Sequence, residues 1–366
     1  MVRRRMAAGS VVSEAWRNLY SGTTRAGLFA LVFVVAVGVL AWVDVRSVVG
    51  IVDGAAQFRA EGAAVQTLNS DPNIDGRRCD ALSGTGALST AGAIRQGSPV
   101  RILAMPASQI TVVEATPGLI AMLPAIAQPL QSVHNVKDGV WMSADLAKAV
   151  GTAPGRVVQT SAGPATVAGV YTWSNDGRNR DLGYAMIAPV PADGNFSQCW
   201  TEVWPADPTL QGLSYVSLTS SGSGARATMG QLNTSLGTTY DAASLLSTRM
   251  TRQAPVAGIV IGVVTGYVSV RIRRLEIASN LHARVPRVGL MWQHLVEALV
   301  WVGGASIITA AGLLWAARWG NPDPSWATWQ IGFRTVLAAA ASSLIGVLAG
   351  VMTAQEKHLF RYAKER

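Results

Sequence analysis

Four stretches of the chain remain apolar over the length that a membrane crossing requires. A helix needs about 20 apolar residues to cross about 30 Å of hydrocarbon. A long insertion of more polar character separates the first stretch from the other three. The pattern therefore predicts four transmembrane helices, one before the insertion and three after it, at residues 26–43, 254–270, 295–317 and 331–352.

The insertion, residues 44–253, alternates short β-type apolar runs with helical pieces, separated by Gly and Pro. We expect residues 44–68 to continue the first transmembrane helix outward as a stalk, and residues 241–250 to return to the membrane as a helix. The predicted fold class is a membrane protein with a mixed α+β domain inserted between its first and second transmembrane helices. Strands are expected at residues 100–105, 109–113, 156–160, 165–171, 184–189 and 213–219, and helices at residues 117–122, 143–150 and 225–236.

The segment before the first transmembrane helix, residues 1–25, has the pattern of an amphipathic helix. Its apolar positions fall on one helical face, namely Val12, Ala15, Trp16 and Leu19. Polar residues, Asn18 among them, fall on the opposite face. Such a helix lies along a membrane surface with its apolar side in the lipid. A disordered N-terminus is the alternative.

Basic residues are concentrated beside the predicted transmembrane helices. Residues 1–25, 271–294 and 353–366 together carry fourteen Lys and Arg against four Asp and Glu, whereas residues 44–253 carry fourteen against fifteen. Cytoplasmic loops hold the basic excess in membrane proteins. We therefore predict that both termini and residues 271–294 are cytoplasmic, and that residues 44–253 and 318–330 face outward from the plasma (inner) membrane of a bacterium. The net charge of +9 is then a topology signal, and we expect no nucleic-acid partner.

The composition agrees with a chain that is part membrane and part aqueous domain. Apolar residues make up 49% and charged residues only 14%, against roughly 25% charged in typical soluble proteins. The sequence holds no phosphate-binding loop, no zinc-protease H-E-x-x-H and no G-x-S-x-G nucleophile motif. We expect no catalytic, cofactor-binding or metal-binding residue here, and we predict that the chain is not an enzyme.

Cys79 and Cys199, the two cysteines of the chain, both lie in the insertion. A cysteine pair outside the cytosol is usually bridged. We predict a disulfide between them, and two unrelated buried thiols are the alternative.

Glycines recur at four-residue spacing in two of the predicted transmembrane helices. This spacing lets helix backbones approach closely where lipid supplies no hydrophobic driving force. It predicts a packing seam that involves Gly258, Gly262, Gly266, Gly346 and Gly350.

Residues 271–294 and their surroundings carry a more specific motif. Arg273-Arg274-Leu275-Glu276-Ile277 resembles the R-R-x-E-I motif of the MacB/FtsX-type permeases of ABC transporters. Glu297, 21 residues beyond Glu276, matches a second glutamate that opens the third transmembrane helix in that family. Residues 14–19 resemble the family's A-x-R-N-L run, and residues 139–147 with 165–171 resemble parts of its outer domain. The order of one helix, a large outer domain and three helices is also the family's, so the resemblance covers nearly the whole chain.

The chain departs from the family at one turn. The family usually has a small-residue turn, A-L-G-A, between the two glutamates, whereas this sequence has His282-Ala283-Arg284-Val285 followed by Pro286. We expect that Pro286 makes the turn in place of glycine, and that the surface for the partner is specialised.

The resemblance implies a permease subunit of an ABC-type complex, with ATP and Mg²⁺ bound by a separate cytoplasmic ATPase. It implies a second copy of this chain or a related permease, and mechanotransmission from the ATPase to the outer domain, for export or extraction of peptides, lipoproteins or other envelope substrates. The alternative is an FtsX-like regulator that controls a cell-wall hydrolase or senses an external ligand without transport. Residues expected to couple to the ATPase are Arg273, Arg274, Glu276, Ile277, His282, Arg284, Pro286 and Arg287, with Glu297 as the carboxylate of the third transmembrane helix.

Overall fold

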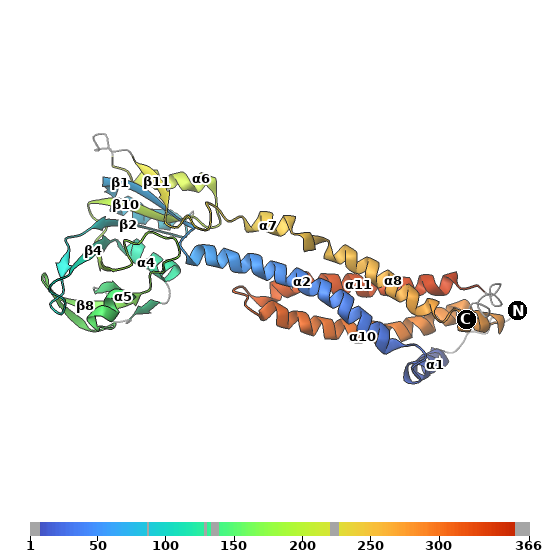
Figure 1. Ribbon diagram of the computed structural model, residues 1–366. Helices are drawn as coiled ribbons and strands as arrows, with labels where there is room; N and C mark the ends of the chain where they lie inside the picture. The colour runs from blue at the N-terminus through green and yellow to red at the C-terminus, as the bar shows by residue number, and fades with distance from the viewer. Residues whose placement is uncertain (1–7, 86–87, 128–129, 133–138, 220–226, 356–366) are drawn as a thin grey trace. The chain divides into compact units, whose positions relative to one another are not determined.

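The computed structural model describes residues 8–85, 88–127, 130–132, 139–219 and 227–355. The chain divides into two units, which are described separately (Figure 1). The helical unit consists of Met1–Asp53 and Ala242–Arg366, and the sheet unit of Gly54–Asp241. The mixed α+β class with long apolar helices on either side of an inserted domain is confirmed.

The helical unit contains four helices that are long and apolar enough to cross a membrane. They include the predicted stretches and extend beyond them, most of all at Ala26–Ala60, Arg287–Arg318 and Ser325–Thr353. The stalk, in contrast, ends at Ala60 and not at residue 68, since a strand begins at Val65. The helices of this unit are α1 (Ala8–Tyr20), α2 (Ala26–Ala60, of which the part from Gly54 on belongs to the sheet unit), α7 (Ala242–Thr248), η3 (Met250–Gln253), α8 (Ala254–Arg271), α9 (Arg274–His282), α10 (Arg287–Arg318) and α11 (Ser325–Thr353).

The core of the helical unit lies along one face of α2. Phe29, Phe33, Val37 and Ala41 recur every four residues and are buried. On α10, Trp301 contacts the rings of Phe29 and Phe33, with centroids 6.0 and 6.4 Å away. The opposite face of α2 exposes apolar residues to the surroundings, as expected of a helix whose outer face meets lipid.

Helices α8 and α11 approach each other closely along a line of small residues. Gly258, Gly262 and Gly266 of α8 face Thr335, Ala339, Ser342 and Ser343 of α11. Gly346 and Gly350 of α11 lie against the backbone of Val263 and Tyr267 in return. A Cβ added at Gly266 would lie 2.0 Å from the carbonyl oxygen of Ser343. Only glycine therefore permits this backbone separation.

The sheet unit is built on a mixed sheet in the order β11-β1-β10-β2-β4-β9-β6-β8-β5, with β3 beside β4 and β7 beside β8. β4 pairs with β9, and β6 with β8, in parallel, and the other pairs are antiparallel. The strands are β1 (Val65–Asp75), β2 (Thr90–Gln96), β3 (Val100–Arg101), β4 (Gln109–Ala115), β5 (Leu130–Ser132), β6 (Val140–Ser143), β7 (Val157–Thr160), β8 (Gly163–Tyr171), β9 (Ala185–Pro189), β10 (Asn195–Glu202) and β11 (Thr228–Gln231). Its helices are α3 (Gly76–Ala81), η1 (Leu82–Thr85), α4 (Pro117–Ile126), α5 (Ala144–Val150), α6 (Pro208–Gln211) and η2 (Gly212–Ser217).

Two of the expected elements of this unit are wrong. Residues 213–219 form most of η2 and its C-terminal cap, not a strand, because the hydroxyls of Ser214 and Ser217 donate to carbonyl oxygens three residues back and stabilise the turns. Residues 225–236 are not a helix: they include β11, which pairs with β1, while residues 225 and 226 lie outside the described residues. Strand β3 covers only the start of the expected 100–105.

The predicted disulfide is present between Cys79 of α3 and Cys199 of β10, with an S–S distance of 1.96 Å. Both cysteines are buried. The next residue, Asp80, accepts hydrogen bonds from the Thr116 hydroxyl (2.5 Å) and the Gly118 N–H (3.1 Å) at the start of α4. Burial raises the pKa of the Asp80 carboxyl, although these hydrogen bonds oppose the rise. The disulfide and Asp80 together attach α3 to the sheet and to α4.

The α8–α11 seam leads to the first prediction. Gly266→Ala is expected to lower the stability of the detergent-solubilised protein by about 1–3 kcal/mol, because the new methyl group overlaps the α11 backbone. Gly304→Ala in α10 is the control, since a Cβ there meets nothing within 4 Å. Thermal unfolding of both variants measures the difference; equal melting temperatures would contradict the role of Gly266.

Candidate functional site: a buried ion network at α9 and α10

Arg273 occupies the joint between α8 and α9 and holds two carboxylates at once. Its Nε and Nη2 donate to the two oxygens of Glu276, at 2.9 and 2.7 Å. Its Nη1 donates to Oε2 of Glu297 on α10, at 2.5 Å. The Arg273 side chain is only 8% exposed. Such charge-assisted hydrogen bonds fix both the distance and the orientation of α9 relative to α10.

Glu297 receives further donors from two directions. The Asn18 amide of α1 donates to Oε1 at 2.8 Å, although the two residues are 279 positions apart. His294 places its Nδ1 3.0 Å from Oε2, and the Gln293 amide lies 3.4 Å from Oε1. One buried carboxylate thus collects donors from α1, from the α8–α9 joint and from α10 itself.

The charges in this network are compensated although they are buried. Burial alone would lower the pKa of the Arg273 guanidinium, but the hydrogen bonds and charges of Glu276 and Glu297 outweigh it and raise that pKa. Arg273 therefore remains cationic. Glu276 is 44% exposed whereas Glu297 is 5% exposed, so the network connects the protein surface to the interior of the unit. Removing Arg273 or Glu297 would leave the other as an uncompensated buried charge.

The remaining predicted coupling residues lie around this network. Ile277 is buried in the core of the helical unit, and Arg274 is half-buried. His282, Arg284, Pro286 and Arg287 are exposed on the turn between α9 and α10. Arg273, Glu276, Ile277 and Glu297 are thus in or beside the network, and the turn is a surface next to it.

The α9–α10 turn is closed by Arg284 and not by Pro286, contrary to the expectation from sequence. Arg284 has φ +59, its N–H donates to the Leu281 carbonyl, and the Val285 N–H donates to that of Asn280. This is a Schellman motif with arginine where glycine is usual. Arg284 therefore stands where the A-L-G-A turn has its glycine, and Pro286 instead precedes the first residue of α10.

Three members of the network are not apparent from the sequence. The pattern places Asn18 on the polar face of an interfacial helix and gives Gln293 and His294 no part in the coupling motif. A signal for the latter two exists, because Gln293, His294 and Glu297 are spaced to share one face of a helix. Nothing in the local pattern of Asn18 points to α10.

The site has little room for a ligand. The crevice beside Arg273, His294 and Glu297 has a volume of about 10 Å³, close to the minimum for a single water. Among the described residues, no group of His, Cys, Asp and Glu is arranged to hold a metal ion. The chemistry of the network is therefore charge pairing between helices.

Comparison with known proteins gives little beyond a weak similarity of fold. No family model matches the sequence, and no curated protein matches it. The extracellular domain of the noncanonical ABC-type transporter YknZ from Gram-positive bacteria is similar with a TM-score of 0.29 and 14% identity, over 41% of this chain and 88% of that one. A domain of a candidate permease protein from Porphyromonas gingivalis is similar with a TM-score of 0.34 and 12% identity, over 47% and 92%. Similarities this low establish neither a family nor a function.

Breaking the network provides the second prediction. Arg273→Leu is expected to destabilise the helical unit by about 3–5 kcal/mol, because Glu297 loses its cation while it stays buried. Arg287→Leu, at an exposed arginine of the adjacent turn, is expected to change stability by less than about 0.5 kcal/mol. Thermal unfolding in detergent measures both, and a melting temperature of Arg273→Leu equal to that of Arg287→Leu would contradict the proposed energetics.

Proposed function

We propose that this chain is the permease subunit of an ABC-type complex and that α9 with the α9–α10 turn docks on a separate cytoplasmic ATPase. The observation that carries this proposal is the meeting of three segments, each of which contains one of the motifs behind the resemblance to ABC permeases. Asn18, the Arg273–Glu276 pair and Glu297 come from three distant parts of the chain and meet in one network.

The network suits the transmission of force. A displacement of α9 acts on Arg273, which is bound to Glu297 of α10, and Glu297 is bound to Asn18 of α1. Helix α8 is in turn held tightly to α11 through the glycine seam. Helices connected in this way move as rigid bodies, which is the mechanical requirement for mechanotransmission.

The exposed turn provides a surface for the partner. Arg284 and Arg287 carry positive charge there, and the apolar side chains of Val288 and Trp292 are 64% and 60% exposed nearby on α10. Arginine and tryptophan are enriched in the energetically dominant parts of protein interfaces. We infer that the docking surface of the ATPase carries carboxylates beside an apolar patch.

In this proposal the chain has no nucleotide site, and ATP and Mg²⁺ belong to the ATPase. The complex contains a second copy of this chain or a related permease, and the sheet unit faces outward and handles an envelope substrate. Both termini are cytoplasmic, and α2, α8, α10 and α11 cross the plasma membrane.

The partner is tested by gentle purification of the tagged chain from its host's membranes, followed by identification of co-purifying proteins. A stoichiometric ATPase with the motifs of ABC proteins is expected. Its absence after mild cross-linking would contradict the proposal. A cell-wall hydrolase bound in equal amount, with no cargo moved on ATP hydrolysis, would replace transport by regulation.

Coupling itself gives the third prediction. Glu276→Lys is expected to abolish stimulation of the ATPase by this chain while the chain stays folded, since the Arg273–Glu297 pair does not need Glu276. Glu14→Lys is a matched control, because Glu14 is 42% exposed and also pairs with an arginine three residues away. ATPase activity of the reconstituted complex measures the effect. Stimulation that survives in Glu276→Lys, or is lost equally in Glu14→Lys, contradicts the role of Glu276.

The topology gives the fourth prediction. The two native cysteines are bridged, so a single introduced cysteine is the only free thiol. Asp323→Cys, in the exposed loop between α10 and α11, should react with a membrane-impermeant maleimide in intact cells, and Ser279→Cys on the exposed side of α9 should react only after lysis. Labelling of Ser279→Cys in intact cells, with labelling of Asp323→Cys only after lysis, would show the opposite orientation in the membrane.

A further inference from the structure

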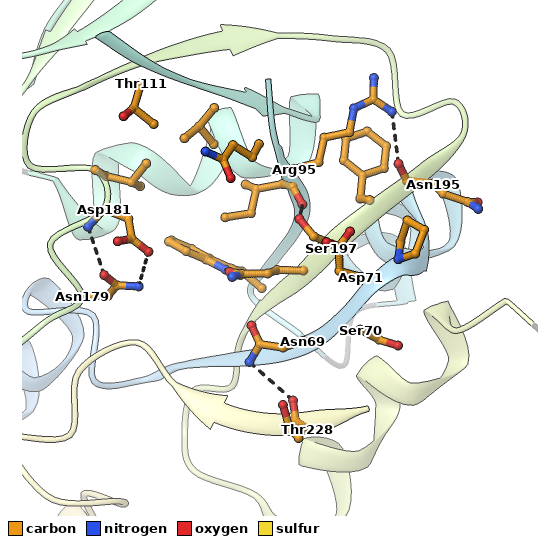
Figure 2. A pocket seen from close by; sticks show the side chains of 18 of the residues that line it. Asn69, Ser70, Asp71, Arg95, Thr111, Asn179, Asp181, Asn195, Ser197 and Thr228 are labelled. Atoms are coloured by element: carbon orange, nitrogen blue, oxygen red, sulfur yellow. Dashed lines mark hydrogen bonds between the residues drawn. The ribbon is translucent and has the colours of Figure 1, made fainter. Parts of the chain in front are cut away.

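A groove of about 800 Å³ opens on one face of the sheet of the sheet unit (Figure 2). The floor of the groove is a row of residues that are paired directly across neighbouring strands. The row consists of Thr228 of β11, Asn69 of β1, Gln198 of β10 and Ile94 of β2. Gln96, two residues beyond Ile94, also lines the groove. The volume falls in the range of small-molecule sites.

One wall is the connection between β8 and β9, and a buried arginine holds it in place. Arg178 pairs with Asp176 at 2.6 Å and donates to the carbonyl oxygens of Ile126 and Ala60. Burial would raise the pKa of Asp176, but the hydrogen bonds and charge of Arg178 outweigh it and lower that pKa, which favours the Asp176 carboxylate. The Arg178 guanidinium also lies over the ring of Trp173, 4.9 Å from its centroid. The wall is thus fixed before any ligand arrives.

The charges of the groove exclude anionic ligands. Of the lining residues that the structure describes, Arg95 alone is basic. Its Nε donates to Glu114 at 2.6 Å, and its guanidinium lies 4.6 Å from the centroid of the Phe196 ring. Two exposed carboxylates, those of Asp71 and Asp181, lie on opposite sides of the groove (Figure 2). A phosphate or an anionic lipid headgroup would meet these two carboxylates and only one basic side chain, which is already paired with Glu114.

Amide side chains dominate the polar part of the groove. Asn69, Gln96 and Gln198 lie on the floor and Asn179 on the wall, where its amide donates to Asp181 at 2.6 Å. The Gln198 oxygen accepts from the Trp200 indole at 2.8 Å, which leaves the Gln198 NH₂ for a ligand. Amides both donate and accept, so they match ligands whose hydroxyl groups do both.

The half-buried indole of Trp173 adds flat apolar surface beside these amides, whereas Trp200, which also lines the groove, is only 3% exposed. A sugar ring presents C–H groups on its faces and hydroxyls at its edge, and aromatic rings attract C–H groups to their electron-rich faces. Carboxylates at both sides accept from hydroxyls more strongly than neutral groups do. We propose that this groove binds an uncharged glycan segment.

This inference deepens the proposed function by naming the class of ligand for the outward-facing unit, and it rests on that proposal only for the side of the membrane on which the glycan is met. The groove lies wholly within Gly54–Asp241, whereas the ATPase assay concerns the helical unit. Failure of sugar binding and failure of ATPase coupling are therefore separate results.

The test uses the full chain in lipid nanodiscs prepared without glycoside detergents, which would themselves offer sugar rings. Uncharged tetrasaccharides of N-acetylglucosamine, of glucose and of mannose are titrated by calorimetry and by saturation-transfer NMR. At least one should bind in the micromolar to millimolar range. Gln96→Ala and Asp181→Asn should each weaken it about three- to tenfold, because each removes one or two hydrogen bonds from the ligand.

Gln159→Ala is the matched control, since Gln159 is an exposed strand glutamine of β7 outside the groove, and it should leave binding unchanged. Spermine is titrated in parallel as a cationic probe. Binding by none of the tetrasaccharides overturns the proposal. Saccharide binding that Gln96→Ala and Asp181→Asn leave intact also overturns it. A spermine affinity that exceeds that of the saccharides and is lost in Asp181→Asn overturns it as well, because the groove would then be a cation site.

Discussion

The helical unit depends on the buried pairing of Arg273 with Glu297. Two charges away from water are costly unless each finds partners of good geometry, and the attraction between them does not by itself repay the cost. Glu297 therefore needs donors from several directions, and the donors present are Arg273, His294, Gln293 and Asn18. Because these donors sit on α1, on the α8–α9 joint and on α10, meeting that need determines where three segments come together.

A steric constraint complements this electrostatic one. Along α8 and α11 the backbones are so close that a methyl group at Gly262 or Gly266 would overlap α11. Such a contact permits little deformation, because close-packed helices shift between discrete arrangements and do not bend continuously. The helical unit thus combines a polar junction at α9 with a rigid helix pair, which are the features that the proposed mechanotransmission requires.

The features that local composition determines are the ones that the sequence predicts most accurately. Helices α2, α8, α10 and α11 follow from apolar length, and the disulfide follows from a lone cysteine pair. Strands β1, β2 and β10 were missed because small and polar residues hide their alternation, and β11 because a short strand is recognised only by its partner β1. The network was found in part: Glu276 and Glu297 through a resemblance, but not Asn18, whose partner is 279 residues away. A polar helical face predicts contact with water, whereas the polar face of α1 also meets a buried carboxylate.

The backbone conformation of Arg284 in the α9–α10 turn is relevant to the proposed docking surface. Arg284 adopts a left-handed conformation that costs a residue with a side chain roughly 1–2 kcal/mol and costs glycine almost nothing. Strain of this kind persists where the surroundings over-determine it, and it is concentrated at functional positions. The two Schellman hydrogen bonds, accepted by the carbonyl oxygens of Asn280 and Leu281, hold Arg284 in this conformation. Its side chain stays exposed. A turn that needed only to reverse the chain would favour glycine, so an arginine here fits the proposal that this turn is where the ATPase docks.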